Sequence, residues 1–160
     1  MSNPRRLARR ARMLRWLLNL YPPYLGAGIH IQHISPDMRS VNVRMKLTRW
    51  NRNYVGTQFG GSLYSMVDPF YMLLLIEQLG REYIVWDKAA SIDFIAPGKG
   101  TVYAQFHVDD ALLSEIRQQT ASGKKYLPRV QVDVRDEAGE LVARVDKILY
   151  VRLKPQARQA

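Results

Sequence analysis

Residues 53–69 read NYVGTQFGGSLYSMVDP and lead from a polar loop into a long apolar segment. From Phe59 to Leu79 hydrophobic side chains occupy every side of a helical wheel, and Gly80 follows at a position where helices commonly end. A helix that is apolar all round has no face that prefers water. The segment therefore predicts a buried helix of about five turns, entered through a loop rich in glycine.

The glycine pair at the start of this helix has two interpretations. Without side chains, Gly60 and Gly61 let the backbone approach a ligand closely, and the unbonded N–H groups of a helix start favour a carbonyl oxygen or an anion. That arrangement is typical of an oxyanion hole. In the alternative interpretation, the pair only permits tight packing or an unusual backbone angle.

Asp68 is the only charged residue between Arg52 and Glu77, and it lies in the middle of the apolar segment. Burying a carboxylate without partners is costly, so this one must be hydrogen-bonded, protonated or open to a cleft. Pro69 adds a second exception, because a proline inside a helix deprives the carbonyl of Ser65 of its partner and tends to kink the axis. Asp68 therefore either lines a functional site or is a structural carboxyl satisfied by the backbone or by a neighbouring subunit.

Alternation of apolar and polar residues predicts about six β-strands beside the helix. A first hairpin turns at Pro36–Asp37, and short connections elsewhere favour antiparallel neighbours. We expect one or two helical turns over 111–121. The expected strands lie near 29–31, 41–47, 92–95, 102–108, 130–134 and 141–153. The fold class is therefore α+β, and because one sheet covers only one side of such a helix, a second subunit is expected to cover part of the rest.

The net charge of +10 resides almost wholly at the two ends of the chain. Residues 1–15 hold six arginines and no acid, with leucines at helical spacing, which predicts an amphipathic basic helix over 5–20 that Pro22 ends. Such a helix can lie on a membrane surface or act as an organelle transit peptide, but more often it packs on its own domain or on a partner subunit. The expected organisation is an N-terminal helical segment 1–24, a domain over 25–153 and a basic tail 154–160.

Composition excludes several chemistries. The chain has no cysteine, which excludes disulfides, thiolate zinc sites, iron–sulfur clusters and a cysteine nucleophile. No apolar run approaches the ~18 residues of a membrane span, and no secretory signal is recognisable, so a cytoplasmic protein is expected. His30, His33 and His107 lack metal-ligand spacing, and the body between the basic ends is nearly neutral. We therefore expect no metal, no redox cofactor and no specific nucleic-acid partner.

The loop and the acid after it resemble the motif of the hotdog-fold acyl-CoA thioesterases of the PaaI-like type. In that family an asparagine, spaced glycines and a helical carboxylate recur at the spacing seen here, and the matching residues are Asn53, Gly56, Gly60, Gly61 and Asp68. The resemblance covers about residues 25–153. It implies a curved antiparallel sheet wrapped around one long helix, with a homodimer as the working unit and tetramers as a further option.

The resemblance also implies roles for these residues. Asp68 would be the general base or the nucleophile, the Gly61 N–H would polarise the thioester carbonyl, and Asn53 of the facing subunit would orient water or substrate. The substrate would be an acyl-CoA or an acyl-carrier-protein thioester, with no cofactor beyond the CoA it carries. Its expected contacts are Gly56, Thr57, Phe59, Gly60 and Ser62, with Lys88 or Lys99 at a CoA phosphate.

Phe59 stands where the family has a histidine, and phenylalanine can neither donate a hydrogen bond nor titrate. The chain is similar to an uncharacterised branch of hotdog proteins with phenylalanine at this position and Asp-Pro in the helix. Three functions stay open. They are a thioesterase, a module that binds acyl thioesters without cleaving them, and an interaction protein whose basic ends bind nucleic acid or anionic lipid.

Overall fold

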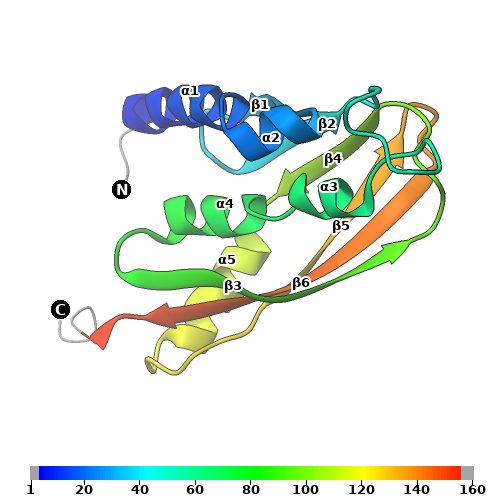
Figure 1. Cartoon of the computed structure of the whole chain (residues 1–160). Coiled ribbons are helices and arrows are strands. Elements are labelled where there is room, and N and C mark those ends of the chain that lie inside the picture. The colour runs from blue at the N-terminus through cyan, green and yellow to red at the C-terminus, as the bar shows by residue number, and fades with distance from the viewer. Residues whose placement is uncertain (1–3, 156–160) are drawn as a thin grey trace.

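The computed structural model describes residues 4–155, in which antiparallel strands form one six-stranded curved sheet with helices packed on it (Figure 1). The expected α+β architecture is therefore present. The strands are β1 Ile29–Ile34, β2 Ser40–Met45, β3 Tyr83–Phe94, β4 Val102–His107, β5 Arg129–Asp136 and β6 Leu141–Leu153. The helices are α1 Pro4–Asn19, α2 Pro22–Ala27, α3 Gly60–Ser65, α4 Phe70–Leu79 and α5 Asp110–Thr120.

The strand order across the sheet is β1-β2-β4-β5-β6-β3, so β3 forms one edge. It pairs with β6 from Tyr83 to Phe94, and the register shifts between Asp87 and Ala89. The sequence predicted only the last part of this strand, near 92–95. The earlier part was missed because the irregularity breaks the two-residue period on which the prediction depends.

The core lies between the sheet and α4. Phe70, Leu74 and Leu75 of α4 are almost fully buried, and the ring of Phe70 lies 4.9 Å from that of Phe106 on β4. Burial of each such side chain contributes about 1.5 to 3 kcal/mol. On the opposite side of α4, Ile76 is 36 % exposed. A single chain thus leaves Ile76 partly open to solvent, and the covering of α4 by a second subunit stays a prediction.

The apolar segment 59–79 is helical as predicted, but it consists of α3 and α4 with an interruption between them. Pro69 lacks an N–H group and so cannot continue the hydrogen bonds of α3. It adopts helical backbone angles as the N-cap of α4, and its carbonyl accepts from the N–H of Leu73 at 2.9 Å. The kink expected at Pro69 is therefore a complete break, and Asp68 lies in it.

The basic N-terminal helix packs on its own chain, as the sequence favoured. Ala11 of α1 is buried, and the Arg10 guanidinium lies 2.8 Å from the Glu77 carboxylate of α4. The Asn19 side chain accepts from the Ile31 N–H at 2.7 Å and donates to the Ile31 carbonyl at 3.0 Å. These contacts fix α1 against the strand at the other edge of the sheet.

Two short elements differ from expectation. Pro22 not only follows the end of α1 but begins α2, because proline is favoured in a first helical turn. The connection at 110–120 forms a helix of 11 residues instead of one or two turns, and the Asp109 carboxylate caps it by accepting from the Leu112 N–H at 2.8 Å.

The predicted basic tail 154–160 extends beyond the described residues, which end at 155. Within residues 4–155 no helix is both long and apolar enough to cross a membrane.

Candidate functional site

Asp68 contacts a lysine that comes from the far end of the chain. The side chain of Lys147 on β6 has no exposed surface, and its Nζ donates to Asp68 Oδ1 at 3.1 Å. The same ammonium donates to the main-chain carbonyl of Asp68 and lies 3.1 Å from Oδ1 of Asp87 on β3. One buried ammonium therefore lies between two carboxylates, which is the pairing that a buried cation requires.

The helix break makes this arrangement possible. In a continuous helix the Asp68 carbonyl would accept from the N–H four residues on, that of Met72. Because α4 begins only at Phe70, the carbonyl is available to Lys147. The Asp68 side chain is 47 % exposed. Its carboxylate is thus fixed from the inside by Lys147 and open to solvent, or to a ligand, on the outside.

Three other acidic groups near Asp68 have raised pKa values. Burial raises the pKa of the Tyr64 hydroxyl, and a hydrogen bond to Asp68 raises it further. Burial also raises the pKa of Tyr24, with a smaller contribution from the Asp68 charge. The pKa of Asp87 is raised by burial, while Lys147 acts in the opposite direction. The Lys147 ammonium thus has two carboxylates as partners and lies 5.8 Å from the centre of the Tyr64 ring.

Lys147, Asp87 and Tyr64 were not singled out from the sequence. A usable signal did exist for Lys147, because Val145, Lys147 and Leu149 share one face of β6 by the two-residue period. All three are buried. A lysine on the buried face of a strand requires an acid as its partner. Asp68 was the acid expected to require a partner of its own.

A second group of predicted residues meets at a cleft of about 320 Å³. The cleft is lined by Asn53, Thr57, Gln58, Gly60 and Leu63 together with Phe94, Ile95, Ala96, Pro97 and Gly98. The Gln58 N–H donates to the Gly98 carbonyl at 2.9 Å, which joins the loop to the turn after β3. The structure therefore brings the motif loop and the Pro-Gly turn together, while Asp68 is not among the residues that line this cleft.

The side chain of Asn53 is occupied by its own loop. Its Nδ2 donates to Thr57 Oγ1 at 2.9 Å and to the Gln58 carbonyl at 3.2 Å, and its Oδ1 accepts from the Thr57 N–H at 2.9 Å. Within one chain these bonds shape the loop that enters α3. The predicted orienting role of Asn53 across a subunit interface stays a prediction.

The glycine pair leaves room for two aromatic rings, because neither glycine has a side chain. A Cβ atom on Gly61 would lie 2.6 Å from the ring of Phe59, and one on Gly60 would lie 3.0 Å from the ring of Phe94. Both rings are more than half exposed. The packing interpretation of the pair thus has direct support. The Phe59 carbonyl accepts from Ser62 and Leu63, and for the Gly61 N–H no acceptor occurs among residues 4–155, so this donor is also available to a ligand.

The remaining predicted contacts lie apart from the cleft. Gly56 is at the tip of the loop with a φ of 84°, where glycine is favoured. Ser62 is half-buried in the first turn of α3, and Lys88 and Lys99 are exposed. Neither lysine is among the residues that line the cleft.

A protein-family model described as a domain of unknown function, DUF4442, matches residues 9–151. The chain belongs to this family. A comparison of this chain with curated proteins found no match.

Solved structures similar to this DUF4442 chain include one protein described as a thioesterase and one described as a probable thioesterase. Protein PA5026 of Pseudomonas aeruginosa, described as a probable thioesterase, superposes with a TM-score of 0.77 at 18 % identity, covering 89 % of this chain and 95 % of its own. Thioesterase HI1161 of Haemophilus influenzae gives 0.64 at 15 % identity, with 89 % and 90 % covered. The PaaI protein of Escherichia coli gives 0.60 at 15 % identity, with 95 % and 96 % covered.

At these identities the similarity shows the fold of the DUF4442 chain. The expected hotdog fold, with a curved antiparallel sheet packed around the central helical segment, is confirmed. Within residues 4–155 no three or more histidine, aspartate and glutamate side chains are grouped so that they could hold a metal ion.

Proposed function

We propose that this DUF4442 protein hydrolyses acyl thioesters, with Asp68 as the general base that activates water or as the nucleophile. The observation that carries the proposal is the Asp68 carboxylate, which lies in a helix break, is 47 % exposed and is held from the inside by a fully buried Lys147. A catalytic carboxylate must be both positioned and accessible, and Asp68 meets both requirements. The fold shared with named thioesterases supports the same reaction.

In the base mechanism, Asp68 takes a proton from water while the water oxygen forms a bond to the thioester carbonyl carbon. The carbon–sulfur bond then breaks, and the proton passes to the leaving thiolate. The products are a carboxylic acid and a free thiol, and no redox step is involved. The Gly61 N–H would stabilise the oxygen on which negative charge develops, because no group among residues 4–155 accepts its hydrogen bond.

The substrate class we propose is an acyl-CoA or an acyl-carrier-protein thioester. Asn53, Gly56 and Thr57 of the motif loop, with Phe59, Gly60 and Ser62 at the start of α3, would contact the thioester arm. In support, part of this loop lines the 320 Å³ cleft with the apolar side chains Phe94 and Ile95. Lys88 and Lys99 would reach a CoA phosphate from the surface.

The active form we propose is a homodimer in which β3 of each chain pairs with its copy. Support comes from the place of β3 at an edge of the sheet, where its outer backbone groups have no strand partner among residues 4–155. Trp86, Phe94 and Ile95, on and just after this strand, are each about half exposed. A second copy would cover these side chains. It would also add its own motif loop near Asp68, because within one chain Asp68 does not line the cleft.

The test is thiol release from a panel of short-, medium- and long-chain and aromatic acyl-CoAs. The wild type, Asp68→Asn and the matched control Asp110→Asn are compared. Asp110 is an exposed acid that pairs with Arg39 on another part of the molecule. We expect turnover by the wild type and by the control, and loss of turnover in Asp68→Asn. Equal rates in all three proteins would contradict the proposal.

The second candidate is a module that binds acyl thioesters without cleaving them. Phe59 favours this candidate. Its ring lies over Gly61, and it cannot donate a hydrogen bond that would help to hold the thioester. Binding of an acyl-CoA by the wild type with no thiol release from any substrate would support this candidate.

A further inference from the structure

The face of α1 that points away from the sheet is apolar in its second half. On the inner face, Ala11 is buried and Leu7, Leu14 and Leu18 pack against the core. Six other apolar side chains of α1, α2 and the residues joining them are at least half exposed. They are Met13, Trp16, Leu17, Leu20, Tyr21 and Leu25. Exposed apolar side chains gathered in this way mark an interaction site.

The exposed side chains form a continuous stripe. Met13, Trp16, Leu17 and Leu20 recur at the i, i+3, i+4 and i+7 spacing of one helix face. Ala11 and the other packed residues occupy the opposite face. Because α1 already buries its inner face on the domain, the stripe makes no contribution to the core of this chain and has to be explained by a partner.

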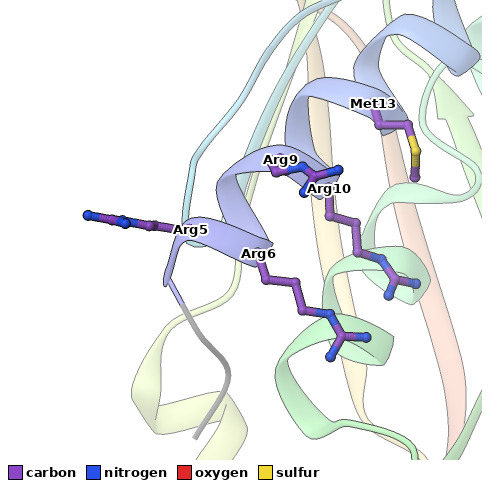
Figure 2. A pocket seen from close by; sticks show the side chains of 5 residues that line it. All are labelled: Arg5, Arg6, Arg9, Arg10 and Met13. Carbon is purple, nitrogen blue, oxygen red and sulfur yellow. The ribbon is translucent and has the colours of Figure 1, made fainter.

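The first half of the same helix is basic. Arginines and a methionine line a hollow of about 600 Å³, shown in Figure 2: Arg5, Arg6, Arg9, Arg10 and Met13. The side chains of Arg6, Arg10 and Met13 point toward α4, whereas Arg5 points away from it (Figure 2). Arg12 is exposed as well, and no acidic residue occurs in the sequence before Asp37.

We propose that this outer face of α1, defined by the stripe Met13, Trp16, Leu17 and Leu20 and by the exposed Arg9 and Arg12, binds the surface of an anionic phospholipid membrane. The helix of 16 residues would lie parallel to the surface over about 24 Å. Its arginines would meet headgroup phosphates, and the stripe would enter the boundary of the acyl chains. Trp16 is suited to that boundary, because an indole ring is apolar but carries a polar N–H.

Two other partners fit these observations less well. A nucleic acid would use the arginines, but the aliphatic side chains of Met13, Leu17 and Leu20 have no favourable contact with a phosphate backbone. A second copy of the chain that docks through the same face would bring no acid to the arginines, because a symmetric contact uses the same patch on both subunits. Only an anionic amphiphilic surface matches both halves of the helix.

The outer face of α1 is separate from the edge proposed for dimerisation. In Figure 1, α1 runs along one side of the molecule and β3 lies on the other side, beyond α4. Membrane binding and pairing through β3 can therefore occur together. A dimer would present two copies of the outer face, which would strengthen attachment through avidity.

The test is cosedimentation of the full chain with vesicles of phosphatidylcholine, with or without about 30 % phosphatidylserine. We expect the wild type to bind only the anionic vesicles. Arg9→Gln/Arg12→Gln should lower partitioning at least tenfold, and Arg9→Lys/Arg12→Lys should retain it, because headgroup attraction depends on charge. Trp16→Ala should lower partitioning severalfold, whereas the matched control Trp50→Ala, at another highly exposed tryptophan, should not change it.

Three results would overturn the proposal. The first is equal binding to neutral and anionic vesicles. The second is binding that Trp16→Ala leaves unchanged but that short duplex DNA removes, which would identify a nucleic-acid surface. The third is a change of oligomeric mass in Trp16→Ala with no change in vesicle binding, which would identify a contact between copies. Unfolding curves of all variants should match the wild type, because every altered side chain is exposed.

Discussion

The Nζ atom of Lys147 contacts both the carboxylate and the main-chain carbonyl of Asp68, 79 positions earlier in the chain. This lysine has no exposed surface, and its ion pairs at 3.1 Å connect β6 to the helix break and to Asp87 on β3. The break would otherwise leave a carbonyl without a partner. Lys147 therefore acts on structure and on the site together, since it stabilises the interruption and orients the acid within it.

Replacing Lys147 with methionine should lower the free energy of unfolding by about 2 to 3 kcal/mol. The loss leaves two neighbouring carboxylates unpaired, but it is smaller than for a fully buried pair because Asp68 is 47 % exposed. Asp87→Asn should reduce the penalty of Lys147→Met by about 1 kcal/mol, because one repulsive charge is gone. Urea unfolding of the four proteins measures this, with Lys125→Met at an exposed position as control. An equal penalty in both backgrounds would contradict the arrangement.

Gly28 follows α2 in the left-handed region, with a φ of 75°. A Cβ atom there would lie 2.5 Å from Nδ2 of Asn51, which donates to the carbonyls of Ala27 and Lys46 and so cannot move freely. Gly28→Ala should therefore destabilise the protein by about 2 kcal/mol or more. Gly26→Ala, inside α2 with nothing within 4 Å, should be neutral or stabilising by up to about 1 kcal/mol. Similar unfolding midpoints for the two variants would contradict the prediction.

The side-chain amide of Asn19 makes the two hydrogen bonds that a neighbouring strand would make with Ile31 of β1. It accepts from the Ile31 N–H and donates to the Ile31 carbonyl. Asn19→Ala should cost about 1 to 2 kcal/mol, since two backbone groups lose their partner. Hydrogen exchange provides a local readout, and the Ile31 amide should exchange faster than in the wild type. The amide of Val43, on the opposite strand, serves as an internal control. Unchanged protection at Ile31 would show that α1 is held by other contacts.

The free edge of β3 predicts a dimer in solution. Sedimentation equilibrium should give twice the mass of one chain at micromolar concentration. Phe94→Asp and Ile95→Asp should each shift the equilibrium toward the monomer, because both side chains are about half exposed in a single chain and would be covered by a second copy. A wild type that stays monomeric at every concentration would contradict the dimer.

Much of the fold could be predicted because periodicity is a local property. The strands near 102–108 and 141–153 alternate regularly, and the structure places β4 and β6 there. β3 was mostly missed because its register shifts at Asp87–Ala89. The helix break was expected only as a kink. A proline makes an interruption possible, but the contact of Lys147 with Asp68 inside the break depends on tertiary structure.

The candidate site could be predicted only in part, for the same reason. Asp68 was identifiable because a lone acid in an apolar segment breaks a local rule. Its partners Lys147 and Asp87 come from strands far away in sequence, and no spacing rule connects them. The motif loop with Asn53 and Gly60 and the turn with Gly98 were each singled out from the sequence. The hydrogen bond from Gln58 that joins them in one cleft was not.

The measurement that tests the central claim most directly is steady-state thiol release by the wild type and Asp68→Asn, with binding of the same acyl-CoA measured by calorimetry. Asparagine keeps the shape of the side chain but cannot accept a proton from water. We predict a fall in kcat of about 100-fold or more, with the dissociation constant nearly unchanged. Equal turnover in the two proteins, or tight binding with no turnover by the wild type, would contradict the claim that Asp68 drives thioester hydrolysis.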